Sequence, residues 1–173
     1  RGRASGRKPI LLLAHIDVVE ALKSDWSADL DPFVFTERDG YYYGRGTSDD
    51  KAMASIFVAN AFRFKQEGYL PDRDIITFDM PGVGQSPSPI IPYRPGWIAY
   101  AARTIMTRLG YDKVDVIGVS WGGGAAQQFA FQHRGRVNKM ILAATTSGMT
   151  MVPGNIDALA RMATPRRYAD PNF

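Results

Sequence analysis

Three short stretches of the chain are mostly apolar. They are residues 10–14, 114–119 and 138–144, and polar or turn-forming residues flank each of them. Apolar runs of this length, rich in valine, isoleucine and leucine, are typical of parallel strands that are covered on both faces. We therefore expect three buried strands here, and a fourth over residues 74–79 that ends near Asp79.

Helical spacing of apolar residues appears between these runs. The first helix is expected to begin at Ser48 as N-cap, with Asp49 and Asp50 in its first turn and Gly68 just beyond its end. A second helix is expected to end at Gly110. Its apolar positions are Trp97, Ala101, Ile105, Met106 and Leu109.

Residues 20–47 contain no long periodic stretch. Aromatic residues alternate with polar ones on either side of Asp39-Gly40, a pair that favours a tight hairpin turn. This segment is expected to hold short strands. Elsewhere strands and helices alternate, which predicts an α/β fold with three layers, α/β/α, around a mainly parallel sheet.

Composition narrows the class of protein. The chain has 173 residues, 45% of them hydrophobic, which is enough for one sizeable core, and it has no cysteine for disulfides or thiolate metal sites. No run approaches the roughly 20 apolar residues of a membrane span. The net charge is +4, but the basic residues are scattered, so we expect neither a nucleic-acid nor a membrane partner.

The chain begins with Arg1 and shows no signal-peptide pattern, so we expect a fragment whose localisation is open, with the cytoplasm favoured.

The main chemical signal is Gly118-Val119-Ser120-Trp121-Gly122, a match to the pattern G-x-S-x-G. A strand before it and helical spacing after it predict a sharp strand-to-helix turn, with the Ser120 hydroxyl at the carboxyl end of the sheet. The backbone N–H of Trp121 is then available to an oxyanion. The alternative is a tight turn without chemistry.

A histidine and an aspartate follow the first predicted strand. His15 and Asp17 come directly after residues 10–14, and catalytic groups and ligands collect at the carboxyl ends of strands in open α/β sheets. The pair is therefore a second candidate for chemistry.

Residues 8–76 resemble the amino-terminal part of the zinc aminoacylase/carboxypeptidase family of metallopeptidases. The resemblance rests on residues 12–19, 31–33 and 44–51, which read LLAHIDVV, DPF and GRGTSDDK. It implies a zinc site built from a histidine of the first motif and an aspartate of the last.

In this resemblance His15 binds one zinc ion, Asp49 bridges two, and Asp17 orients the histidine or assists catalysis. Imidazole and carboxylate groups suit Zn²⁺. Where the family continues into paired glutamates, however, residues 77–82 read TFDMPG, and the family's later ligands are absent. Two ligands leave the zinc site incomplete. The alternative is a remnant motif whose side chains only form hydrogen bonds.

Residues 77–173 resemble α/β-hydrolases, specifically the poly(3-hydroxyalkanoate) depolymerase branch. The motifs that carry the resemblance are residues 79–86, 118–122, 151–154 and 164–168. It implies an incomplete α/β-hydrolase core, because the acid and the catalytic histidine of the family lie downstream of the region matched here.

The second resemblance implies that Ser120 is the nucleophile, that the Trp121 N–H is one oxyanion donor, and that His133 is structural. It also implies one shared sheet for the two segments. The expected strand order is 74–79, 9–14, 114–119, 138–144. The first strand then lies beside the strand that leads to Ser120, and we hypothesise that His15 serves as its base, oriented by Asp17 or Asp49.

The resemblances together predict a hydrolase-derived chain: a serine-esterase segment fused to a metallopeptidase segment, with a small-molecule ester or a peptide or amide as substrate. We expect weak activity or none, because a serine without its usual partners is a poor nucleophile. The alternatives are a zinc-dependent amidohydrolase or carboxypeptidase, and a non-catalytic chimeric domain. The missing strands predict open sheet edges through which copies of the chain can associate.

Overall fold

The structure is a computed structural model that describes residues 2, 5–18, 20–90 and 94–146. The chain divides into two compact units, one of residues 1–17 and 48–146 and the other of residues 18–47 and 147–173. Each unit is described by itself. The motifs at residues 151–154 and 164–168 lie outside the described residues.

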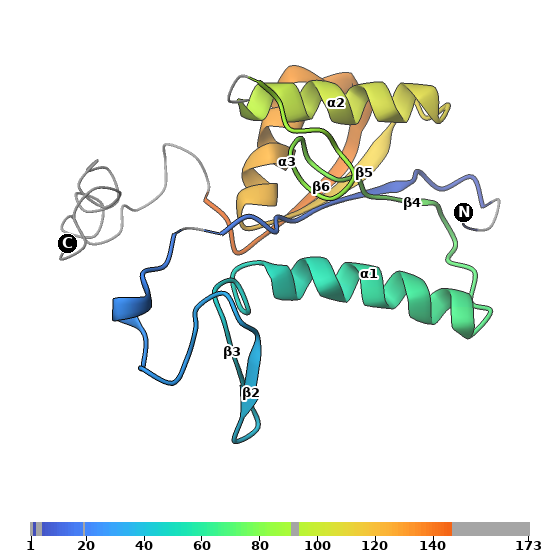
Figure 1. Cartoon of the computed structure of the whole chain (residues 1–173). Coiled ribbons are helices and arrows are strands. Elements are labelled where there is room, and N and C mark those ends of the chain that lie inside the picture. The colour runs from blue at the N-terminus through green and yellow to red at the C-terminus, as the bar shows by residue number, and fades with distance from the viewer. Residues whose placement is uncertain (1, 3–4, 19, 91–93, 147–173) are drawn as a thin grey trace. The chain divides into compact units, whose positions relative to one another are not determined.

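A four-stranded parallel sheet forms the centre of the first unit (Figure 1). Its strands are β1 (Ile10–Leu13), β4 (Ile75–Ile76), β5 (Val114–Val119) and β6 (Val137–Ala143), in the order β4-β1-β5-β6. This is the order expected from the sequence. The α/β class with a mainly parallel sheet is therefore confirmed.

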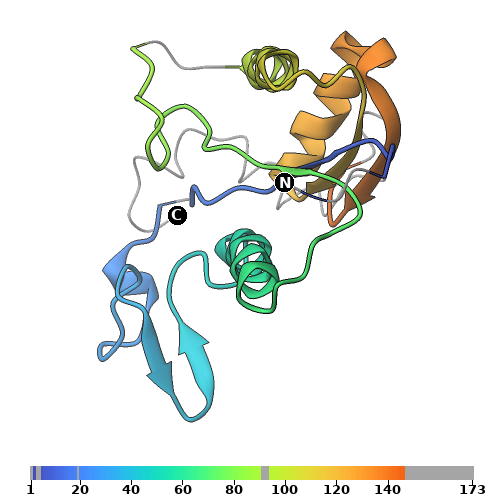
Figure 2. The ribbon, with the colours of Figure 1, turned by 90° about the vertical axis from the view of Figure 1, so that its right-hand side faces the viewer.

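The core lies between this sheet and two helices on one of its faces, α2 (Pro95–Arg108) and α3 (Trp121–Gln132) (Figure 2). Its buried residues are Leu11, Leu13, Ile76, Met80, Ile98, Ala99, Ala102, Met106, Val114, Val116, Ala125, Ala126 and Phe129. The prediction of which residues form the inner face of α2 is partly wrong, because Trp97 is 56% exposed while Ile98 is buried. The small side chains of Ala99 and Ala102 let α2 approach its neighbours closely on that side.

The helix α1 (Lys51–Gln66) lies on the opposite face of the sheet from α2, and none of its residues is fully buried. It begins later than expected, with Asp50 rather than Ser48 as its N-cap and no acidic residue in its first turn. Its end is as expected. Gly68 has a φ of 66°, and the N–H of Tyr69 donates to the Phe64 carbonyl, as in a Schellman motif.

Two strands differ from the sequence expectation. The strand expected over residues 74–79 is only two residues long, because Asp79 bonds to its own loop instead of a neighbouring strand: its carbonyl accepts from Ser86 Oγ and its carboxylate from the Gln85 N–H. The strand expected to be buried at residues 138–144 is largely exposed.

The exposure of β6 follows from its place at the end of the described sheet order. Ile141 is 58% exposed and Met140 40%. Association of copies through this edge stays a prediction. Among the described residues, no helix combines the length and the apolar character needed to cross a membrane.

The described part of the second unit contains a β-hairpin. Its strands are β2 (Thr36–Arg38) and β3 (Tyr41–Tyr43), which pair antiparallel. Asp39 and Gly40 both have positive φ, 54° and 78°, as a type I′ turn requires. The hairpin predicted at this pair is therefore confirmed, and it is preceded by a short 3₁₀ helix, η1 (Lys23–Asp25).

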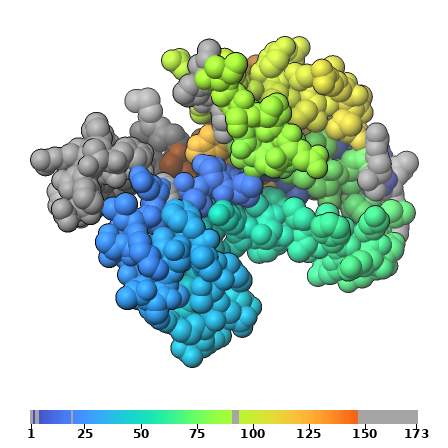
Figure 3. Space-filling view, viewed as in Figure 1, coloured from blue at the N-terminus to red at the C-terminus, as the bar shows by residue number. Residues whose placement is uncertain are grey.

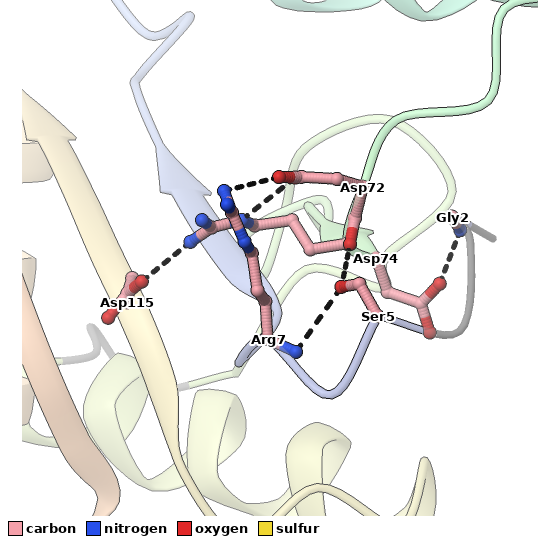
Figure 4. A network of polar contacts seen from close by, with 7 residues as sticks. Gly2, Ser5, Arg7, Asp72, Asp74 and Asp115 are labelled. Carbon is pink, nitrogen blue, oxygen red and sulfur yellow. Dashed lines mark hydrogen bonds and ion pairs between the residues drawn. The ribbon is translucent and has the colours of Figure 1, made fainter.

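Polar contacts fasten the loop before β4 to the amino-terminal end of the sheet (Figure 4). Arg73 Nη1 lies 2.7 Å from Asp115 Oδ2 on β5, and Arg73 Nε lies 3.2 Å from Asp72 Oδ1. Arg7, shortly before β1, pairs with the same Asp72. The side chains of Arg73 and Asp115 are only 21% and 17% exposed, so water screens their attraction little.

We expect Arg73→Met to lower the free energy of unfolding by about 1–3 kcal/mol, because it leaves the half-buried Asp115 carboxylate without its charged donor. The matched control is Arg63→Met, which removes the exposed pair with Glu67 at 3.8 Å and should cost about 0.5 kcal/mol or less. Urea unfolding followed by circular dichroism measures both. Equal losses in the two variants would contradict the role given to Arg73.

Candidate active site

The serine of the G-x-S-x-G pattern stands at the junction of β5 and α3. Ser120 has φ 51° and ψ −124°, a conformation that a residue with a side chain rarely adopts. Its N–H donates to the Ala143 carbonyl of β6 at 3.0 Å, and its carbonyl accepts from the Gly123 N–H at 2.9 Å. These bonds hold the serine at a sharp strand-to-helix turn, as the pattern predicts.

Two glycines make room for this turn. A Cβ at Gly118 would lie 2.6 Å from the Gly122 carbonyl oxygen, and a Cβ at Gly122 would lie 2.3 Å from the Leu13 carbonyl oxygen. Both distances are too short for a side chain. The start of α3 is therefore packed directly against the end of β1.

The register of the sheet brings a histidine to the serine. Leu13 of β1 is paired with Gly118 of β5, so the residues two positions further on, His15 and Ser120, lie at the same level. His15 Nε2 is 3.3 Å from Ser120 Oγ, within hydrogen-bond reach. The histidine side chain is 10% exposed, so the ring is held mostly away from water.

Two aspartates lie on either side of the imidazole ring. His15 Nδ1 is 3.2 Å from the backbone oxygen of Asp17 and 3.5 Å from its Oδ1. His15 Nε2 is also 3.2 Å from Asp49 Oδ1, which accepts from Ser120 Oγ at 3.4 Å. The Asp17 and Asp49 side chains are 70% and 79% exposed. Their charges are therefore strongly screened by water.

Asp50 is a further residue of the site that the sequence did not single out. It is 5% exposed, and its carboxyl lies near the main chain and the ring of His15. Burial raises the pKa of the Asp50 carboxyl above its ordinary value, while the His15 contacts lower it by less. The sequence predicts this side chain in the first turn of a helix, and no local signal distinguishes that role from proximity to His15, which follows β1.

The predicted oxyanion donor is the first residue of α3. The N–H groups in the first turn of a helix have no acceptor within the helix, and the helix dipole favours negative charge there. Trp121 directly follows Ser120, so its N–H lies in this turn. Its role as an oxyanion donor stays a prediction.

The predicted zinc ligands, His15 and Asp49, lie close together, but among the described residues no third ligand joins them. No three His, Cys, Asp or Glu side chains among the described residues are arranged to hold a metal ion. A catalytic zinc takes three protein ligands. The donor set in the described part of the chain therefore does not fit a catalytic zinc.

His133 lies at the other end of α3 from the serine. The helix has 12 residues, which places its two ends about 18 Å apart. His133 packs edge-on against Phe129, with ring centroids 5.5 Å apart. Burial lowers the pKa of His133 below its ordinary value, and the charges of Arg103 and Arg136 lower it further.

A serine at a strained turn between a central parallel strand and a helix is the signature of α/β-hydrolases. Residues 50–169, more than half of the chain, match the alpha/beta hydrolase fold family, and the chain belongs to this family. Residues 11–82 match peptidase family M20/M25/M40. Both resemblances expected from the sequence are therefore confirmed.

Among its relatives, the poly(3-hydroxyalkanoate) depolymerase of Ectopseudomonas oleovorans is 52% identical over 103 residues, which are 59% of this chain and 36% of the relative. The N-fatty-acyl-amino acid synthase/hydrolase PM20D1 of Xenopus tropicalis is 48% identical over 66 residues, 38% of this chain and 12% of the relative. The chain thus spans about a third or less of these curated relatives. It joins a region that resembles the depolymerase to a segment that resembles the peptidase family.

The crystal structure of Cfl2 from Burkholderia cenocepacia shares the fold. The TM-score is 0.54 with 17% identity, over 90% of this chain and 39% of that one. At this level of identity the likeness concerns the fold alone.

Substituting two of the three glycines at the start of α3 tests the contact between α3 and β1. We expect Gly122→Ala to lower the free energy of unfolding by about 1–3 kcal/mol, because its methyl group would meet the Leu13 backbone. Gly124→Ala is the matched control: a Cβ there meets nothing within 4 Å, so it should raise stability by about 0.5–1 kcal/mol. Chemical denaturation measures the free energy of unfolding of both variants. An unchanged free energy of unfolding in Gly122→Ala would contradict the packing described.

Acidification tests the environment of His133. Because the folded-state pKa is below the unfolded one, the unfolded chain binds the proton first, and stability falls as the pH drops from about 7 through the ordinary histidine pKa. We expect wild type to lose more unfolding free energy than His133→Gln between pH 7 and 5, by at most about 1.4 kcal/mol per pH unit. Equal changes in the free energy of unfolding with pH in the two proteins would contradict this prediction.

Proposed function

We propose that the chain is a serine-type ester hydrolase in which Ser120 is the nucleophile and His15 is the general base. The observation that carries the proposal is the 3.3 Å distance between His15 Nε2 and Ser120 Oγ at the strained turn. A base within this reach can remove the proton that an unassisted serine hydroxyl holds too tightly.

The proposed base needs the tautomer of His15 that carries its proton on Nδ1. The backbone carbonyl of Asp17, which can only accept a hydrogen bond, favours a proton on Nδ1 at 3.2 Å, whereas the Asp49 carboxylate, also at 3.2 Å, favours one on Nε2. In the tautomer protonated at Nδ1, Nε2 accepts the proton of Ser120 Oγ when the hydroxyl turns to it from Asp49 Oδ1. In Ser-His-Asp triads, too, the group that orients the histidine is recognised by its geometry and not by its position in the chain.

The reaction proceeds by acyl transfer. Ser120 Oγ attacks the ester carbonyl while its proton moves to His15 Nε2, and the oxyanion lies toward the N–H of Trp121. The imidazolium then gives its proton to the departing alkoxide, and water releases the acyl group by the same steps in reverse order. Asp49 Oδ1, 3.2 Å from Nε2, stabilises the positive ring while it exists.

An ester is the substrate class that similarity to the depolymerase supports, since the name of that relative describes cleavage of a polyester of hydroxyalkanoates. Turnover is expected to be slow. Asp17 and Asp49 are largely exposed, so they stabilise the imidazolium less than a buried carboxylate would.

A fluorophosphonate probe, which labels activated serines, tests the proposal together with hydrolysis of 4-nitrophenyl acetate. We expect labelling of wild type, no labelling of Ser120→Ala, and a labelling rate lower by about 10²- to 10⁴-fold in His15→Gln. The chain has two histidines, so His133→Gln is the matched control and should label at the wild-type rate.

Circular dichroism verifies that each variant is folded. A folded wild type without labelling would overturn the proposal in favour of a non-catalytic domain. Equal labelling of wild type and His15→Gln would leave Ser120 reactive but remove His15 as its base.

A further inference from the structure

A cavity of about 660 Å³ lies between α1 and the sheet. Its walls come from the end of β1, from residues 54–62 of α1 and from the segment that follows β4. Cavities of this size hold small organic ligands. Figure 3 shows side chains of α1, in blue-green, at the surface of the molecule.

The walls of this cavity are mainly apolar. The apolar lining residues are Leu12, Leu13, Ala14, Ile16, Ala54, Phe57, Val58, Ala59, Phe62, Phe78, Met80 and Val83. Among the few polar ones, Asp79 is already engaged, because its carboxylate accepts from the Gln85 N–H at 3.1 Å. An apolar ligand therefore matches the cavity better than a charged one.

The cavity exists because α1 does not close onto the sheet as α2 and α3 do. The helix has no fully buried residue, whereas the opposite face of the sheet is packed with buried side chains. Apolar side chains of α1 such as Val58 and Phe62 remain more than half exposed. A ligand that filled the space would remove this surface from water.

One end of the cavity reaches the candidate active site. His15 lines the cavity and at the same time contacts Ser120 Oγ. When the carbonyl carbon of an ester lies at Ser120, one of the two chains of the ester therefore lies at the entrance to the apolar cavity.

We propose that this cavity binds the acyl chain of a medium- to long-chain ester, and so makes the enzyme selective for apolar acyl groups. The proposal rests on the proposed function for its catalytic part. Residues 54–62, which line one wall along α1, span about 12 Å. That length is available to an extended hydrocarbon chain running away from His15.

Chain-length dependence tests the proposal through turnover. For 4-nitrophenyl esters from acetate to decanoate, we expect kcat/KM to rise by up to about fourfold for each added methylene until the cavity is filled. Ala54→Phe, which fills the cavity, should abolish the rise of kcat/KM with chain length. Ala61→Phe, on α1 but outside the lining, is the matched control and should keep the rise. A flat profile in wild type would overturn the proposal.

Binding without turnover separates this inference from the proposed function. The probe is a dansyl-labelled undecanoic acid added to folded Ser120→Ala, with decanoate as competitor. We expect saturable fluorescence that decanoate displaces and acetate does not, and at least tenfold weaker binding when Ala54→Phe is added. Val58→Trp is the second blocking variant if Ala54→Phe does not fold.

The two experiments have distinct outcomes. Displaceable binding in a protein that neither hydrolyses esters nor reacts with fluorophosphonate would keep the apolar site and remove the proposed function. Hydrolysis without chain-length dependence and without displaceable binding would remove the apolar site and keep the esterase. If neither displaceable binding nor ester hydrolysis is observed, both the apolar site and the proposed function are overturned.

Discussion

The parallel pairing of β1 with β5 is the contact on which the candidate site depends. The ladder sets Leu13 opposite Gly118, and the absence of a side chain at Gly122 lets α3 start against the Leu13 carbonyl. In this register His15 and Ser120, which are 105 positions apart in sequence, end within hydrogen-bond reach. A slip of one residue would turn every side chain of β1 to the other face of the sheet, and the histidine would leave the serine.

The electrostatic surroundings of the histidine are uneven. The ring is mostly buried, while the carboxylates of Asp17 and Asp49 project into water, where their charge is screened. The nearly buried carboxyl in the group is that of Asp50, and burial favours its neutral form. The imidazole is therefore held by well-placed hydrogen bonds more than by strong charge, which suits precise positioning better than strong activation.

Features set by local chemistry were predictable from the sequence. The Asp39-Gly40 turn, the glycine after α1 and the turn at Ser120 each depend on a few neighbouring residues that permit a particular backbone conformation. The strand order followed from the family resemblance. Features set by distant neighbours were not predictable: Asp50 is the N-cap of α1 and lies near His15 instead of in the first turn of the helix, and the exposure of β6 depends on what lies beside it. The approach of His15 to Ser120 required the register, which apolar runs alone do not specify.

The acceptor nearest His15 Nδ1 is a main-chain oxygen, the carbonyl of Asp17. Every amino acid carries this group, so the shortest contact of Nδ1 depends on the path of the backbone after β1 and not on the side chain at position 17. Residue 17 can change in the course of evolution while the ring keeps its orientation. A comparison of side chains among related proteins would therefore overlook the group that orients this histidine.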